Sequence, residues 1–201
     1  MNRHKVSMTR LIGAVALAVF FSIAGLARQS TGSAPQNPAP LLTAAPSANP
    51  VSDMLRQLLP RYTKYMVGAA QSMPADKYGY KPTPEQITFG HLVLHVAQSN
   101  VLLCSKLSSA PPPQITATDA DGKDKLVGAI QTSFDYCTEV LAKADDSNLG
   151  VSVQLSPTRS MTRAGVMITL ACDWYDHYSA QAGYLRLNGI LPPSAQPAPG
   201  R

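Results

Sequence analysis

The sequence predicts an all-α fold: a four-helix bundle with a long connection between its second and third helices. Two observations predict the helices, because four segments repeat their apolar residues with the helical period and alternating strand patterns are nearly absent. A third predicts the connection, because "PPP" at 111–113 breaks the chain after the second helical segment. Four helices of similar length around one core are typical of a bundle.

Residues 1–27 have the layout of a secretory signal peptide. Arg3, Lys5 and Arg10 precede an apolar run over 11–24, and Gly25 and Ala27 supply the small residues of a cleavage site. The run is short for a membrane span, which needs about 20 residues. We therefore expect cleavage after Ala27 and export to the periplasm or beyond, with an uncleaved N-terminal anchor as the alternative.

Between the signal segment and the first helix, residues 28–50 are rich in Pro, Ala and Ser, which predicts a disordered tether. Residues 194–201 have the same character and predict a loose tail. This leaves one domain over 51–193, which is large enough for a single core.

Charge gives no support for nucleic-acid binding. The whole chain has 17 Lys and Arg against 12 Asp and Glu, a net charge of +5, and removal of the three basic residues of 1–27 lowers it to +2. No cluster of Lys and Arg remains in the mature chain. We expect no nucleic-acid partner and no stable membrane span after cleavage.

The first two helices are expected at about 51–73 and from a Thr88 cap to about Leu107. Pro60 lies inside the first and should kink it or split off its first turns. A loop rich in Tyr and Pro separates the two helices. The second helix carries an apolar stripe of Phe89, Leu92, Val96 and Leu103.

The other two helices are expected at about 124–144 and from Ser160 or Thr162 to about Asn188. The polar connection between them, 145–160, holds one short alternating piece, "VSVQL". Gly189 suits the left-handed position that ends a helix, and Pro192 prevents its continuation.

Polar residues fall in the apolar stripes of the second and fourth helices. At 100° per residue, His177 lies inside the stripe of the fourth helix, Asp173 on its flank, and Gln181 one turn beyond His177. His95 lies inside the stripe of the second helix, whereas His91 lies further from its centre. The pattern predicts that both helices direct an imidazole to the interior.

Buried imidazoles and carboxylates need partners, because burying one alone costs a few kcal/mol. His95, Asp173 and His177 could satisfy each other by hydrogen bonds, or they could bind a metal ion, as facing helices of bundles often do. Two His and one carboxylate suit Zn²⁺, Fe²⁺, Ni²⁺ or Mn²⁺. Spacing alone leaves both interpretations open.

Two passages resemble the DinB-like superfamily of bacterial four-helix bundles. One is "PTPEQITFGHLVLHVAQSN" at 82–100, and the other is "DWYDHYSAQAGYLRLNGILPP" at 173–193. The resemblance covers about 51–193. It implies a divalent metal site with one His on the second helix and a His-x-x-x-His pair on the fourth. These positions map to His95, Asp173 and His177, so a carboxylate replaces the first His of the pair.

The resemblance implies a metal-dependent enzyme, either a hydrolase or a thiol-transferase-like protein, that acts on an unknown small-molecule substrate. No catalytic residue is identified, since the candidate general bases Asp176, His91 and Tyr178 are better explained as structural or exposed. The alternative is a non-catalytic bundle that binds a ligand or partner and has a degenerate metal site. Relatives often dimerise, so a homodimer and a monomer are both open.

The chain has three Cys residues, at 104, 137 and 172. The long connection would let the second and third helices run parallel, which would bring Cys104 and Cys137 to similar heights. An exported protein can form disulfides, so we hypothesise a bridge between them. The alternative is that both pack as small apolar residues. Cys172 points roughly 140° away from His177 and is not expected to be a ligand.

Overall fold

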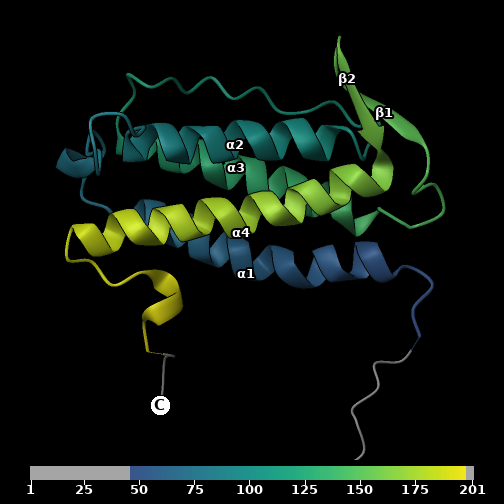
Figure 1. The fold of residues 1–201 in the computed structure, drawn as a ribbon, viewed down its shortest axis with the longest axis horizontal. Helices are drawn as coiled ribbons and strands as arrows, with labels where there is room; N and C mark the ends of the chain where they lie inside the picture. Colours follow the sequence, from purple (N-terminus) through teal and green to yellow (C-terminus); the bar gives the residue numbers. More distant parts are fainter. Residues whose placement is uncertain (1–45, 198–201) are drawn as a thin grey trace, which may run out of the picture. The chain divides into compact units, whose positions relative to one another are not determined.

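The computed structural model describes residues 46–197, which form four α-helices (Figure 1). They are α1 (Pro50–Ser72), α2 (Phe89–Ser105), α3 (Lys123–Ala142) and α4 (Arg163–Leu187). Two short 3₁₀ helices, Ala75–Lys77 and Pro193–Ala195, follow α1 and α4. The predicted fold class is confirmed, and the helix bounds agree to within a few residues.

The helix ends follow the expected capping chemistry. The Thr88 hydroxyl accepts a hydrogen bond from the His91 N–H at 3.0 Å, and the Thr162 hydroxyl accepts one from the Gly165 N–H at 3.1 Å. Gly189 has a φ of 72°, as its place after α4 requires. The expected splitting of the first helix at Pro60 is wrong, because α1 continues through it.

Contacts between side chains give the direction of each helix. Tyr62 packs against Tyr175 and Tyr65 stacks on Tyr178, with the same offset along the chain, so α1 and α4 run parallel. The α2 and α3 helices also run parallel, and the 17-residue connection over 106–122 returns the chain along their length (Figure 1).

Two consecutive links join α2 to α3. Asn100 donates a hydrogen bond to Ser133 at 3.1 Å, and one helical turn later Cys104 forms a disulfide with Cys137. The hypothesised bridge is therefore confirmed. Trp174 of α4 joins the first link, because its indole N–H donates to the Asn100 side-chain oxygen at 2.8 Å. We call these five residues the Asn100 cluster, and its polar and aromatic members are fully buried.

The connection between α3 and α4 forms a β-hairpin that the sequence only half predicted. The "VSVQL" piece overlaps β1 (Ser152–Ser156), which pairs antiparallel with β2 (Arg159–Thr162). Val153, Leu155 and Met161 pack against the core. The β2 strand escaped prediction because its sequence, "RSMT", has no apolar alternation.

Contacts distant in the sequence hold the two ends of the domain. Asp146, after α3, accepts hydrogen bonds from the N–H groups of Val51 and Ser52 at 2.8 and 3.0 Å, and so caps α1. Asn49 of the expected tether accepts a hydrogen bond from the Asp146 N–H. At the other end, Ser194 of the expected tail donates its N–H to the Tyr178 hydroxyl at 2.8 Å.

The predicted signal peptide at 1–27 and most of the predicted tether at 28–50 lie outside the described residues. Within 46–197, none of the helices has the length and apolar character needed to cross a membrane.

Candidate functional site

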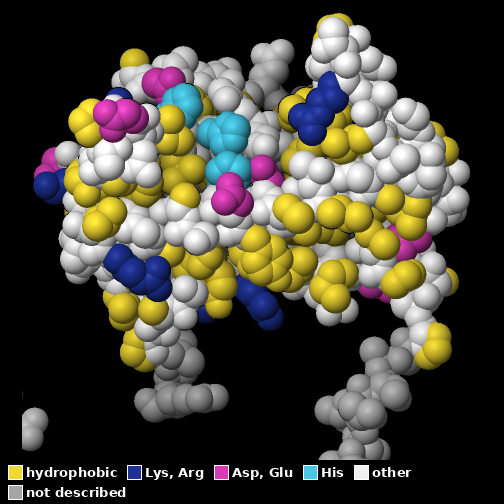
Figure 2. Space-filling model, viewed as in Figure 1, with side chains coloured by type: hydrophobic (Ala, Val, Ile, Leu, Met, Phe, Trp, Pro, Cys, Tyr) yellow, Lys and Arg dark blue, Asp and Glu magenta, His cyan; other side chains and the backbone are white. Residues whose placement is uncertain are grey.

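The candidate residues lie where α2 and α4 pack antiparallel. Three pairs of contacts fix the register of the two helices: Trp174 with Asn100, His177 with His95, and Tyr184 with Phe89. The His pair therefore occupies the middle of the α2–α4 interface. His side chains form a row on this face, over α2 and α4, with acidic side chains beside them (Figure 2).

The structure brings His95 and His177 together. Their ring centroids are 4.8 Å apart, with the ring planes inclined at 45°. Asp173 joins them from one turn earlier on α4, and its carboxylate oxygen lies 3.4 Å from Nδ1 of His177. We call His95, Asp173 and His177 the histidine cluster. His177 therefore contacts both of the other predicted site residues, His95 and Asp173.

Hydrogen bonding fixes the proton position on His177. Its Nδ1 lies 2.7 Å from the main-chain carbonyl oxygen of Asp173. A carbonyl oxygen can only accept, so Nδ1 carries the proton and donates. In the neutral ring, Nε2 then keeps its lone pair. Metal-binding His residues commonly have this arrangement, in which the second nitrogen is held by a carbonyl or carboxylate.

His95 differs from the sequence prediction in its burial. It is exposed, whereas the side chains of His177 and Asp173 are only 14% and 18% exposed. The prediction that His95 points into the interior is wrong, because the buried face of α2 is formed by its neighbours Leu92, Val93, Leu94, Val96 and Ala97. His95 lies at the solvent edge of the α2–α4 interface, which leaves the cluster accessible from outside.

The pKa of the His95 imidazole is lowered. The buried part of the ring disfavours the charged form, the nearby His177 adds to this, and Asp173 opposes it more weakly. At neutral pH His95 is therefore neutral and keeps a nitrogen lone pair. A neutral imidazole is the form that binds metal ions.

The other sequence candidates have structural roles or are exposed. His91 holds the Asp119 carboxylate through Nδ1 at 2.8 Å, at the rim of the same face. Asp176 is exposed, and the Tyr178 hydroxyl accepts a hydrogen bond from Ser194. Cys172 is a free, exposed thiol. The sequence could not have predicted the His91–Asp119 pair, since Asp119 lies in the irregular 106–122 connection.

Gln181 is the residue near the cluster whose chemistry the sequence did not resolve. It is fully buried, and neither its side-chain oxygen nor its nitrogen has a hydrogen-bond partner among residues 46–197. Its place within the apolar stripe, one turn after His177, was the only signal in the sequence.

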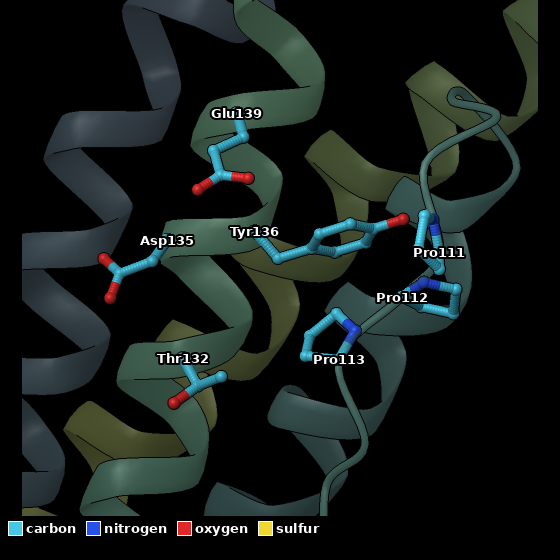
Figure 3. A pocket seen from close by; sticks show the side chains of 7 residues that line it. All are labelled: Pro111, Pro112, Pro113, Thr132, Asp135, Tyr136 and Glu139. Carbon is cyan, nitrogen blue, oxygen red and sulfur yellow. The ribbon is translucent and has the colours of Figure 1, made fainter.

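A hollow elsewhere on the bundle offers less chemistry. It has a volume of about 360 Å³ and lies between Pro111–Pro113 and the face of α3 that carries Thr132, Asp135, Tyr136 and Glu139 (Figure 3). The Tyr136 ring points to the prolines, and its hydroxyl donates to the Ala110 carbonyl. The carboxylates of Asp135 and Glu139 point away from the prolines. No polar groups converge there, so we do not consider it a candidate active site.

The two imidazoles of the histidine cluster carry nitrogen lone pairs of the kind that bind divalent metal ions. The His95 ring is neutral at neutral pH. In His177, Nδ1 donates to the Asp173 carbonyl, and Nε2 is available. The Asp173 carboxylate lies on the Nδ1 side of His177, and among residues 46–197 no three His, Cys, Asp or Glu side chains are grouped closely enough to hold an ion. Ligation by Asp173 would therefore require its side chain to turn, and the three-ligand set stays a prediction.

Residues 59–178 match the profile of a protein family described as the DinB superfamily. This family is generally metal-binding. A search of curated proteins gave no match to the chain.

Solved structures show the same fold. A DinB-like protein from Bacillus subtilis has 20% identity and a TM-score of 0.55, over 68% of this chain and 92% of that protein. One from Bacillus cereus has 13% identity and a TM-score of 0.59, over 73% and 96%. A conserved protein from Enterococcus faecalis has 16% identity and a TM-score of 0.53, over 68% and 96%. At these identities, the likeness concerns the fold alone.

Proposed function

Because this chain belongs to the DinB superfamily, we propose that it is an exported, divalent-metal-dependent enzyme of hydrolase or thiol-transferase-like type. His95, Asp173 and His177 would hold the ion, which is Zn, Ni, Fe or Mn. The observation that carries this proposal is the contact between the two imidazoles, 4.8 Å apart at a solvent-accessible edge of the bundle. A bundle selected for stability alone would place an apolar side chain at position 177, where the His side chain is only 14% exposed.

Each residue has a defined task in the proposed site. A divalent ion would supply a Lewis acid that polarises a substrate oxygen or stabilises a thiolate. The Nε2 atom of His177 would be its ligand atom, because Nδ1 donates its proton to the Asp173 carbonyl. The lowered pKa of His95 keeps its ring neutral. The Asp173 carboxylate, one turn from His177, adds negative charge that favours a cation.

Export is supported by two features of the chain. The first 27 residues have the layout of a signal peptide. In addition, Cys104 and Cys137 form a disulfide, which persists in oxidising compartments and is rare in a reducing cytosol. N-terminal sequencing of the protein recovered from the periplasm or medium should give Arg28 as the first residue. An intact Met1 would contradict cleavage.

Metal binding is tested by elemental analysis and by thermal unfolding with added Zn²⁺, Ni²⁺, Fe²⁺ or Mn²⁺. We expect about one equivalent in the wild type, and stabilisation of about 2.7 kcal/mol when the free ion is at 100 times its Kd. His177→Ala and His95→Ala should abolish both effects. His91→Ala is the matched control, because it removes a His of the same face that is already paired with Asp119.

A second function is favoured by the position of the Asp173 carboxylate on the Nδ1 side of His177. In this alternative the histidine cluster is a hydrogen-bonded group in a non-catalytic bundle that binds a ligand or partner. Absence of bound metal, with thermal unfolding unchanged by ions and by chelator, would favour this alternative over the enzyme.

A further inference from the structure

Gln181 stands out among the fully buried polar side chains of residues 46–197. The other three, Ser52, Asn100 and Ser133, all form hydrogen bonds: Ser52 with Asp146, and Asn100 and Ser133 with each other. Neither Oε1 nor Nε2 of Gln181 has a partner. Buried polar groups in folded proteins are nearly always paired, so this side chain requires a partner that is not part of the described chain.

The position of Gln181 follows from the register of α2 and α4. It lies one turn after His177 on nearly the same face of α4, at the spacing where side chains are direct neighbours. It falls between the His177–His95 and Tyr184–Phe89 contacts. At this level of α2, between Phe89 and His95, the main-chain carbonyls accept hydrogen bonds within the helix and so do not pair with Gln181.

The side chains of α2 at this level do not satisfy the carboxamide. Phe89 and Leu92 are apolar and buried. The Nδ1 atom of His91 is already bonded to Asp119 in the 106–122 connection. A Met or Leu at position 181 would fill a similar volume without an unpaired polar group, so packing alone does not explain a Gln here.

We propose that Gln181 is a positioning residue whose carboxamide holds a buried water molecule between α2 and α4, next to the imidazole of His177. Water matches the unpaired atoms, because it can donate to Oε1 and accept from Nε2 at once. Buried waters commonly satisfy polar groups of this kind in protein interiors.

This inference deepens the proposed function and rests on it for its consequence. Hydrolysis of an ester or amide consumes one water, whose OH goes to the acyl carbon and whose hydrogen goes to the leaving group. A water held beside the imidazole pair supplies that reactant, so the position of Gln181 favours the hydrolytic form of the proposed enzyme over the thiol-transferase form.

The experiment is NMR on the metal-free, ¹⁵N-labelled protein, comparing wild type with Gln181→Met. In the wild type we expect cross-peaks from a long-lived water to the Gln181 side-chain amide and to the His177 ring protons. In Q181M the cross-peaks to His177 should disappear, while the melting temperature stays equal or rises. Gln131→Met is the matched control, because Gln131 is a surface residue that donates only to Asp135 on the same helix.

Absence of a water cross-peak at Gln181 in the wild type would overturn the proposal, as would its persistence at His177 in Q181M. A melting temperature lowered in Q181M but not in Q131M would also overturn it, because that result indicates a protein partner for Gln181. Since no metal is present, failure of the metal titration would affect the proposed function and leave these outcomes unchanged. In the metal-bound protein, Q181M should weaken affinity for the ion about 10- to 100-fold.

Discussion

The α4 helix contributes to two neighbouring polar groups, the Asn100 cluster and the histidine cluster. They differ in how many of their donors and acceptors form hydrogen bonds. In the Asn100 cluster, the Asn100 oxygen accepts from Trp174, its nitrogen donates to Ser133, and Ser133 donates to the Ile130 carbonyl. In the histidine cluster, one nitrogen of His177 is occupied and the other has no bond to the described chain. Gln181, beside it, has no partner at all among these residues.

We interpret this difference as a division of roles, in which the Asn100 cluster stabilises the bundle and the histidine cluster is the proposed binding site. A fully paired buried network stabilises one arrangement of helices, and it gains nothing by binding another molecule. A buried group without hydrogen-bond partners in the described chain, such as Gln181, costs stability until something binds there. Asn100 and His95 are five residues apart on α2, so a single helix contributes to both kinds of site.

The largest effect should come from the disulfide of the Asn100 cluster. Replacing both Cys104 and Cys137 with Ala should lower the free energy of unfolding by about 3–4 kcal/mol, since the bridge closes a loop with a sequence separation of 33 residues. Urea unfolding of the double variant measures this. Reduction of the wild type should reproduce most of the loss, whereas Cys172→Ala, at the exposed free thiol, should cause little change.

A smaller loss should follow from breaking the hydrogen bonds of the same cluster. Asn100→Leu leaves the Trp174 indole N–H buried without an acceptor, which should cost about 1–3 kcal/mol in urea unfolding. Gln98→Leu, at an exposed position of the same helix, is the control and should change stability little. Metal affinity should be the same in both variants. A parallel loss of metal binding in Asn100→Leu would show that the two clusters are not separate.

The fold could be predicted almost fully from the sequence, because periodicity, the Thr88 cap and Gly189 are local signals. The parallel course of α2 and α3 followed from the length of their connection, and it led to the correct disulfide. The Asp146 cap of α1 could not be predicted, because its partners lie 94 and 95 residues away. Periodicity placed His95 in an apolar stripe, but it could not show that neighbouring residues fill the core.

The predicted ligand set was the part of the site that depended on resemblance. Helical spacing alone placed His177 and Asp173 one turn apart, and the structure shows them in contact. The facing of His95 and His177 needs the register of α2 against α4, which no local pattern encodes. The register is set by contacts such as Tyr184 with the Ile87 carbonyl at 2.7 Å, between residues far apart in the chain.

Asp173 either binds the metal ion directly or orients His177, and substitutions at this position distinguish the two roles. As a metal ligand, it should be sensitive to loss of charge, so Asp173→Asn and Asp173→Ala should each weaken the metal Kd at least tenfold, about 1.4 kcal/mol. Isothermal titration with Zn²⁺ measures both. Asp176→Asn, an exposed neighbour, is the control. If D173N binds as wild type and only D173A is weakened, then Asp173 orients His177 through Nδ1 and does not ligate.

The smallest effect concerns acid stability, which should come from the structural carboxylates and not from the histidine cluster. Burial disfavours the charged form of Asp146, but the hydrogen bonds from Ser52 and the Val51 N–H outweigh it and lower the pKa of Asp146 below 3.8. Its contribution is therefore complete well above pH 3.8 and is lost as the pH falls below that value. Asp146→Asn should cost about 1 kcal/mol at neutral pH and reduce the acid sensitivity of unfolding. Unfolding measured from pH 7 to pH 3 checks this, with Asp176→Asn as the control. An unchanged pH profile in Asp146→Asn would show that the Asp146 cap of α1 does not contribute to acid unfolding.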